Sequence, residues 1–463
     1  MLCQEAGANP VRPVGAIRIR AESMNWFGDA PGSQYSFLGA TARFGLEQRT
    51  SRFEWRVEFA APLLLGLPDD AVLPAPQGLL GHGANYYLAN GRATQAIGLF
   101  PKQVYLRVKS ADQRWQGRLG RFETAEGAET APRSGALATV KRTRLAQRLI
   151  GPFGFTHIGR SFDGADLHYG RGHTQVTALA AVPTAGVFDM DGWGRVPQIV
   201  LGYAAVTTAG PLGADNGEVR IFGLYYRDGR EVARTDNRPL AVRQGDLEPV
   251  SVGTIGGHYL QAVLTGIGRF DLTAWGALQF GQWGQQDHRA AAGTIELGWQ
   301  PAMLETIRPW LRAGYFRSSG DRDAADATHQ TFFQVLPTPR VYARFPFYNL
   351  MNLEDASVSL LLRPGTRTTL RADLRGLKLA EPADGWYIGG GAFDRDGFGY
   401  ASRPSNGSRA LATLLDLSAD VQINRRWTVA GYASHALAGQ VIRSIYPSRA
   451  NGRYGYLELE YRW

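Results

Sequence analysis

Residues 53–59, Phe-Glu-Trp-Arg-Val-Glu-Phe, alternate apolar and charged side chains without a break. Successive side chains of a β-strand point to opposite faces, so the four apolar residues share one face and the three charged residues share the other. A helix, with a period of 3.6 residues, would mix both kinds around its surface. The stretch therefore predicts a strand whose two faces meet different surroundings.

The same alternation recurs along the chain, at residues 17–22, 104–109, 270–274, 294–300, 370–375 and 415–423. These segments run for about 9–11 residues, the length of a tilted membrane strand, whereas soluble strands average about 5–6. Aromatic residues cap many of them, as interfacial girdles would. The capping residues are Trp26, Phe59, Phe122, Trp283, Trp299, Trp310, Trp427 and Trp463. We count 16–18 such segments and expect an all-β, transmembrane antiparallel barrel of about 18 strands.

The last residues strengthen this prediction. Leu457, Leu459, Tyr461 and Trp463 alternate with charged residues, and the chain stops on the aromatic. This ending resembles the terminal strand of outer membrane proteins that the barrel-assembly machinery recognises, so we expect that machinery and outer membrane lipid as partners. Met1 to Pro10 has neither a cationic start nor an apolar core. We expect that the export signal of such a protein is missing from this sequence.

Composition limits the function classes. The formal net charge is +9, and only four of the 50 basic residues are Lys. Arg binds carboxylates and phosphates bidentately, although a GC-rich genome would also favour Arg codons. The positive field favours anionic partners in either case. The sole cysteine, Cys3, excludes an intramolecular disulfide framework and any cysteine-based metal cluster.

Three segments do not alternate, and we expect them to be long loops of a single barrel domain that spans residues 1–463. They are residues 124–161, 329–350 and 384–409. In the first, Leu137, Val140, Leu145 and Leu149 form a helix-like stripe that Gly151-Pro152 ends. Long loops often carry function.

Acidic residues are absent from 130–162, 327–353 and 397–415, which coincide with these loops. Inward-folded loops of this kind would place guanidinium groups in a pore and select anions. The alternative is a set of solvated loops held to lipopolysaccharide phosphates. The loop residues concerned are Arg133, Lys141, Arg142, Arg144, Arg148, Arg160, Arg340, Arg344, Arg403 and Arg409.

The parity of the strands assigns side chains to the two faces. We expect Phe53, Trp55, Val57, Leu370 and Leu374 to face lipid. Arginines of the opposite parity should face the lumen. This assignment is strict, because a one-residue slip in register would move every side chain of a strand to the other face. The arginines concerned are Arg18, Arg20, Arg56, Arg371 and Arg375.

Catalytic and metal-binding patterns are weak. Asp163 and Asp166 could form a carboxylate pair, but mixed charges on a pore wall are commoner. His157, His168 and His173 lie close in sequence without the spacing of a metal site. No phosphate-binding loop, nucleophile elbow or nucleic-acid module occurs. We therefore expect no catalytic residues, no metal, no cofactor and no nucleic acid.

The chain from about Leu119 onward resembles the alginate export family of outer membrane porins. The resemblance rests on Leu119-Gly-Arg-Phe122 with residues 141–164, on residues 331–349, and on residues 451–461. Gly120-Arg121 matches the start of a Gly-Arg-Gln sequence in the well-known exporters, with Phe122 in place of the glutamine. The resemblance implies an 18-stranded barrel with an Arg-rich constriction through which polyanionic alginate leaves the cell. It also adds Arg121 to the expected pore residues.

These observations lead to one principal hypothesis and two alternatives. The principal one is a passive outer membrane channel for anionic polysaccharides or oligosaccharides, with a periplasmic export partner and no chemistry on the substrate. The first alternative is an outer membrane enzyme, which would need a Ser–His–acid cluster at one rim. The second is a soluble β-protein that binds polyanions, which would not require detergent.

Overall fold

The computed structural model describes residues 10–28, 31–132, 134–210, 216–446, 448 and 451–463. The expectations for Cys3, for the first nine residues and for Arg133 lie outside these residues. Within them, no helix is long and apolar enough to cross a membrane.

Eighteen antiparallel strands form a closed barrel, because β22 pairs with β1 as well as with β21. The strand count and the fold class predicted from the sequence are thus confirmed. The barrel strands are β1 (Arg12–Asn25), β2 (Gln34–Arg49), β3 (Phe53–Leu65), β5 (Phe100–Lys109), β6 (Trp115–Phe122), β7 (Phe162–Arg171), β8 (Thr174–Pro183), β9 (Ile199–Ala209), β10 (Gly217–Asp228), β11 (Val250–Thr265), β12 (Gly268–Trp283), β13 (Gln286–Pro301), β14 (Trp310–Ser318), β16 (Leu353–Leu362), β17 (Thr368–Leu379), β20 (Ala410–Gln422), β21 (Trp427–Ala438) and β22 (Gly452–Arg462).

The remaining elements lie in the connections. Short β4 pairs with β3, β15 pairs with β13, and β18 pairs with β19 in a separate hairpin. These elements are β4 (Gln95–Ile97), β15 (Thr328–His329), β18 (Trp386–Gly389), β19 (Tyr400–Arg403), α1 (His82–Ala89), α2 (Gly135–Val140), the π-helical turn Lys141–Leu145, α3 (Leu240–Gly245), the 3-10 turn Pro339–Val341 and α4 (Gln440–Ile445).

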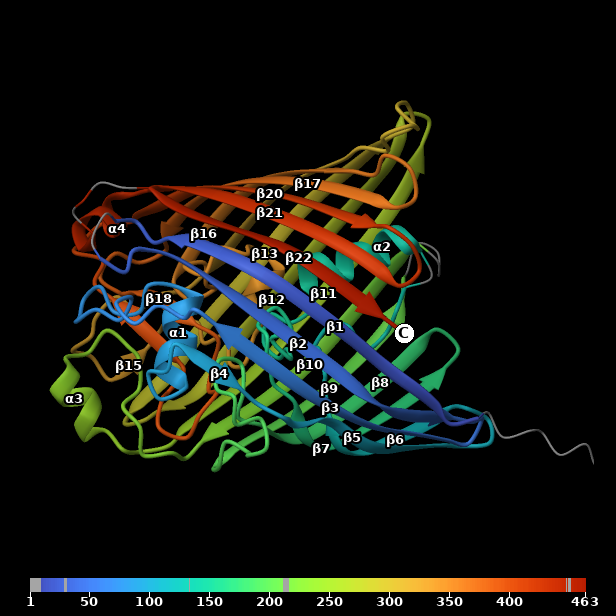
Figure 1. Ribbon diagram of the computed structural model, residues 1–463, viewed down its shortest axis with the longest axis horizontal. Helices are drawn as coiled ribbons and strands as arrows, with labels where there is room; N and C mark the ends of the chain where they lie inside the picture. The colour runs from blue at the N-terminus through green and yellow to red at the C-terminus, as the bar shows by residue number, and fades with distance from the viewer. Residues whose placement is uncertain (1–9, 29–30, 133, 211–215, 447, 449–450) are drawn as a thin grey trace, which may run out of the picture.

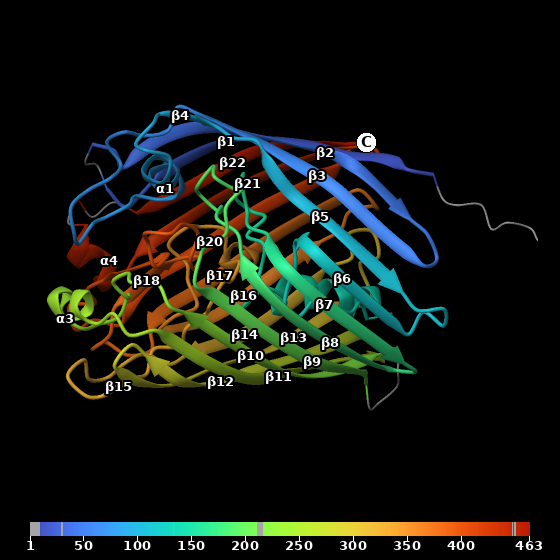
Figure 2. The same ribbon diagram turned by 90° about the horizontal axis from the view of Figure 1, so that it is seen from below.

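The two ends of the barrel differ. Helices α1, α3 and α4 gather at one end in both views, opposite the C-terminus (Figure 1, Figure 2). The long connections, including residues 66–99, 319–352 and 380–409, join strands at that end, while short turns join them at the other. Outer membrane barrels have short periplasmic turns and longer extracellular loops, so this loop end corresponds to the extracellular end of such a barrel.

The wall has the alternation expected from the sequence. On β1, Ile17 and Ile19 are exposed on the outer face, whereas Arg18 and Arg20 point inward to the backbone of residues 154–156. The other strands follow the same pattern. Outward residues include Phe53, Trp55, Val57, Leu370 and Leu374, and inward residues include Arg56, Arg371 and Arg375.

Only four of the eight aromatic residues predicted for the interfacial girdle lie on the outer face of the barrel. Phe59, Trp299, Trp427 and Trp463 lie on the outer face, where a girdle belongs. The other four are buried in the interior, because each lies at a position of inward parity or in a loop that packs inside. They are Trp26, Phe122, Trp283 and Trp310. Trp310, for example, donates its indole N–H to the inward carboxylate of Asp271, at 2.8 Å.

Candidate anion passage inside the barrel

Residues 123–161, here the luminal segment, leave the wall where β6 and β7 separate and cross the barrel interior. On one side, Lys141 Nζ lies 2.6 Å from the carboxylate of Glu218 on β10. On the other side, Arg144 donates hydrogen bonds to Ser359 on β16 and to Asp373 on β17, the latter at 3.2 Å. The segment is therefore bound to two separate parts of the wall.

The helix-like stripe of the luminal segment packs as the sequence indicated. The side chains of Leu137, Val140, Leu145 and Leu149 are buried. The helical turns nevertheless end at Leu145 rather than at Gly151-Pro152. The backbone becomes extended at Ala146, and Gln147 has a φ of 68°, so the chain changes direction before the proline.

Most arginines predicted for the pore are buried structural residues. Arg148 packs its guanidinium over the rings of Tyr342, Trp275 and Phe316, at 4.3–5.3 Å from the centroids. Arg375 binds Asp355 and the carbonyl oxygen of Tyr342. Arg144 and Arg148 are therefore engaged within the protein, and so is Arg375.

Three further arginines donate to loop carbonyl oxygens, Arg160 and Arg403 between loops and Arg340 within its own loop. Arg160 donates to the carbonyls of Gly390 and Ala392 in the third loop. Burial lowers the pKa of Arg160 to about 10. Arg340 and Arg403 act in the same way. Arg340 donates to the carbonyls of Phe345 and Tyr348, and Arg403 to those of Gln77 and Leu79.

Arg121 lies on the outer face of the barrel, which corrects its expected place in the pore. It shares its parity on β6 with Leu119, which is 68% exposed, and it pairs with Val104, another outward residue. Its guanidinium binds Asp163 at 2.7 and 2.8 Å and donates to the carbonyl oxygen of Trp193 at 3.0 Å. Asp163 and Asp166 thus lie on opposite faces of β7 and form no carboxylate pair.

A cavity of about 410 Å³, here the inner cavity, lies between the luminal segment and the wall. Six arginines and four carboxylates line it, together with the aromatic rings of Phe155, Tyr342, Tyr432 and Tyr456. The arginines are Arg18, Arg20, Arg142, Arg340, Arg344 and Arg371. The carboxylates are Asp373, Asp416, Asp420 and Glu458. Cations therefore exceed anions in the lining.

Four of the predicted pore residues line this cavity: Arg142, Arg340, Arg344 and Arg371. Arg142 is exposed, and Arg344 lies over the rings of Tyr432 and Tyr456 at 5.3 and 5.7 Å. Arg371 is held 2.5 Å from Asp373. Among the described residues, neither Arg142 nor Arg344 has a carboxylate within ion-pair distance.

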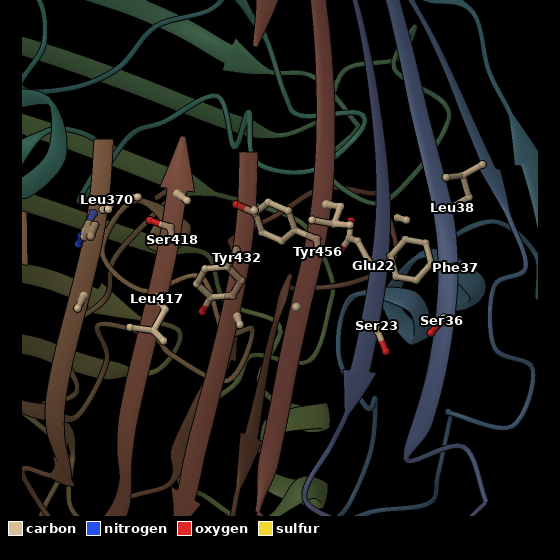
Figure 3. Close-up of a pocket in the computed structure, with 18 of the residues that line it drawn as sticks. Glu22, Ser23, Ser36, Phe37, Leu38, Leu370, Leu417, Ser418, Tyr432 and Tyr456 are labelled. Carbon is tan, nitrogen blue, oxygen red and sulfur yellow. The ribbon is translucent and has the colours of Figure 1, made fainter. Parts of the chain in front are cut away.

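Sequence reasoning missed other members of the lining. Arg18 was assigned to the lumen but not to the site, and the tyrosines Tyr432 and Tyr456 were not singled out. Figure 3 shows Tyr432 and Tyr456 on the neighbouring strands β21 and β22, beside Glu22 of β1. Their inward parity was the available signal, because Tyr456 shares its face with Glu458, and Tyr432 pairs with Tyr456 across the two strands.

The outside of the same wall is hollowed. An apolar hollow of about 1120 Å³ lies against β17, β20, β21, β22, β1 and β2, where Leu38, Leu370 and Leu417 are exposed (Figure 3). Small residues such as Gly431, Ala433 and Gly455 form its floor. Because these side chains have outward parity, the hollow faces membrane lipid and not the passage.

The histidines singled out in the sequence have different surroundings. His157 hydrogen-bonds Glu22 at 3.2 Å, and burial lowers the pKa of His157 to about 4. His168 lies between Thr177 and Asp166 in a second luminal cavity of about 320 Å³, and His173 is exposed at a turn. In the part of the chain that the structure describes, no three His, Cys, Asp or Glu side chains are grouped to hold a metal ion.

A closed barrel of eighteen strands, apolar outside and charged inside, defines an outer membrane β-barrel of the porin type. Residues 143–455, more than half of the chain, match the family model described as Alginate export. The chain belongs to this family of outer membrane proteins.

Solved structures with the same fold include OccD3 (OpdP) and OccK2 (OpdF) of Pseudomonas aeruginosa and OccAB2 of Acinetobacter baumannii. OccD3 is 9% identical, with a TM-score of 0.58 over 99% of this chain and 92% of its own. OccK2 and OccAB2 are each 8% identical, also with TM-scores of 0.58. They align over 98% and 97% of this chain, and over 99% and 98% of their own. No curated protein matches the sequence.

Proposed function

We propose that the protein is a passive outer membrane channel for an anionic polysaccharide or oligosaccharide of the alginate type, which it does not modify. The observation that carries the proposal is the inner cavity, where Arg142 and Arg344 have no carboxylate within ion-pair distance among the described residues. Guanidinium groups in a partly desolvated constriction bind carboxylates bidentately and select anions. The family to which the chain belongs supports export as the direction.

The reversal potential of the reconstituted channel in a salt gradient tests this proposal. We expect anion selectivity at 0.1 M salt that weakens at 1 M, because the Debye length falls from about 10 Å to about 3 Å. The double replacement Arg142→Ala and Arg344→Ala should lower the selectivity. Arg322→Ala, at an exposed loop position outside the cavity, is the matched control. Cation selectivity of the unaltered protein would contradict the proposal.

A hydrolytic activity is the second candidate, because one cluster has the required order of residues. The Thr177 hydroxyl lies 3.0 Å from His168 Nδ1, and His168 Nε2 lies 3.4 Å from Asp166. Cross-strand pairing of His168 with Thr177 is sufficient to explain this order, and Arg118 also binds Asp166. If the protein hydrolyses uronate oligosaccharides and Thr177→Val abolishes that hydrolysis, the enzyme is favoured. If no hydrolysis occurs, the channel remains the better proposal.

A further inference from the structure

A further cavity shares lining with the inner one. This outer cavity, of about 440 Å³, opens among the long loops and is lined by Trp26, Phe188, Phe398 and other aromatic residues. Arg340 lines both cavities. Residues 151–160, here the strap, supply Pro152, Gly154 and Phe155 to the inner cavity and Phe153 to the outer one. The strap therefore lies between the two cavities, together with residues 338–346, which also contribute to both linings.

Cations on the wall hold the strap by its carbonyl oxygens. Arg18 on β1 donates to the carbonyls of Gly154 and Thr156, at 2.9 and 2.5 Å. Arg20 donates to that of Phe155 at 2.9 Å. Further along, Lys102 on β5 donates to the carbonyls of Ile158 and Arg160, at 2.9 and 3.2 Å. Uncharged carbonyl oxygens of the strap thus occupy a row of cationic groups on the wall.

The three cations differ in their carboxylate partners. Arg20 also binds Glu458 at 2.6 Å, and Lys102 lies 3.5 Å from Glu123. Arg18 has its nearest carboxylate, again Glu458, at 3.8 Å, and both of its hydrogen bonds go to neutral carbonyls. Among these cations, Arg18 is therefore the one that an incoming anion can take over most easily.

Arg18 is also accessible to such an anion, because it lines the inner cavity. A carboxylate carries a full negative charge, so it attracts the guanidinium more strongly than a neutral carbonyl does, and its two oxygens match the guanidinium fork. A carboxylate can accept two parallel N–H bonds from Arg18, whereas the strap offers it two separate carbonyls. An anion in the inner cavity thus competes directly with the strap for the same donors.

We propose that Arg18 is the carboxylate-binding residue of the passage, that the strap occupies its site in this structure, and that a sugar carboxylate displaces the strap and joins the two cavities. The proposal rests on the proposed function, since the ligand is the anion that the inner cavity receives. Displacement opens the route to the loop end only when an anionic substrate is present. A neutral sugar offers Arg18 only uncharged oxygens, which lack the charge and the paired oxygens with which a carboxylate competes against the strap.

The chemical reactivity of a cysteine in the strap tests whether a carboxylate displaces the strap from Arg18. Thr156 is buried, so Thr156→Cys in a Cys3→Ser background should react slowly with a methanethiosulfonate reagent. We expect glucuronate to speed its reaction about tenfold, as a tenfold shift toward the released strap requires, and glucose to leave it unchanged. Thr235→Cys is the matched control, because Thr235 is a buried loop threonine that also donates to a carbonyl, far from Arg18 in sequence.

Replacement of Arg18 identifies the residue. Arg18→Gln removes the charge, so Thr156→Cys should react fast without glucuronate and no faster with it. Arg18→Lys retains the charge without the fork and should respond to glucuronate more weakly. Resistance of the barrel to unfolding in unheated detergent shows whether each variant has folded.

The outcomes separate this inference from the proposed function. If the channel is anion-selective but glucuronate does not change the reaction rate of Thr156→Cys, the proposed role of the strap is wrong and the proposed channel function still stands. Equal effects of glucose and glucuronate, or slow reaction in Arg18→Gln, also overturn it. Cation selectivity overturns the proposed function, and a glucuronate effect that requires Arg18 would still support the carboxylate site.

Discussion

Replacing Arg144 should free the luminal segment from one side of the barrel. Arg144→Met keeps the length of the buried side chain but removes its guanidinium group. Three interactions are lost: the hydrogen bonds to Ser359 and Asp373, and the ion pair with Glu296 at 3.7 Å. The contacts of Lys141 with β10 remain, so the segment should loosen at β16 and β17 while staying attached on the other side.

The structure sets the size of this effect. Breaking a buried ion pair costs about 3–5 kcal/mol when the partner charge is left alone. Here Asp373 keeps Arg371 at 2.5 Å and Glu296 keeps Arg312 at 3.2 Å, so neither carboxylate is left without a cation. Hydrogen bonds to charged groups contribute about 1.5–3 kcal/mol each. We therefore expect a loss of about 2–4 kcal/mol in docking, or about a 30-fold to 1000-fold rise in the undocked population.

Hydrogen–deuterium exchange of peptides from residues 135–150 measures this population. Arg142→Met is the matched control, because Arg142 lies two residues away, is exposed and has no ion-pair partner among the described residues. We expect fast exchange in Arg144→Met and unchanged exchange in Arg142→Met. Anion selectivity should fall more in Arg142→Met than in Arg144→Met. Equal exchange in the two variants would refute the assignment of Arg144 as an anchor.

Three further predictions concern the wall and the loops. Ile221 is 68% exposed near the middle of β10, so Ile221→Arg should lower the free energy of unfolding in lipid by about 2–4 kcal/mol, and Ile221→Ala by less. Burial raises the pKa of Asp321 to about 7 and that of Asp384 to about 6. Packing at the loop end should therefore be strongest below about pH 4 and weaken as the pH rises through 6 and 7, because the folded loops favour the protonated forms. Asp321→Asn should reduce this dependence of exchange rates on pH, and an unchanged profile would contradict it. Arg403→Met should speed exchange in residues 66–99, since it leaves two loop carbonyls without their donor.

The wall was predictable because its signal is local. Each strand carries its own alternation, so the opposite facing of Ile17 and Arg18 follows from neighbouring residues. The same rule would have placed Arg121 correctly. It has the parity of Leu119 and Trp115, but the family resemblance assigned it to the pore.

The site was less predictable, because the state of each arginine depends on residues far away in the chain. The sequence showed acid-free runs in the loops, and the luminal segment does lie inside the barrel. It could not show that the partner of Arg144 is Asp373, 229 residues later, while Arg142 has no such partner. Arginines that look equivalent in sequence are therefore divided into anchors and cavity residues by tertiary contacts alone.

The attachment of the strap to β1 also bears on how the protein folds. Arg20, which holds the strap, is itself oriented by Glu458, 438 residues later on β22. This pair forms only when the first and last strands have met, and contacts between such distant parts of a chain form slowly. The strap therefore acquires its full set of partners only after the barrel has closed. Protection of residues 154–156 during refolding should accordingly appear with closure of the barrel and not with formation of the hairpins.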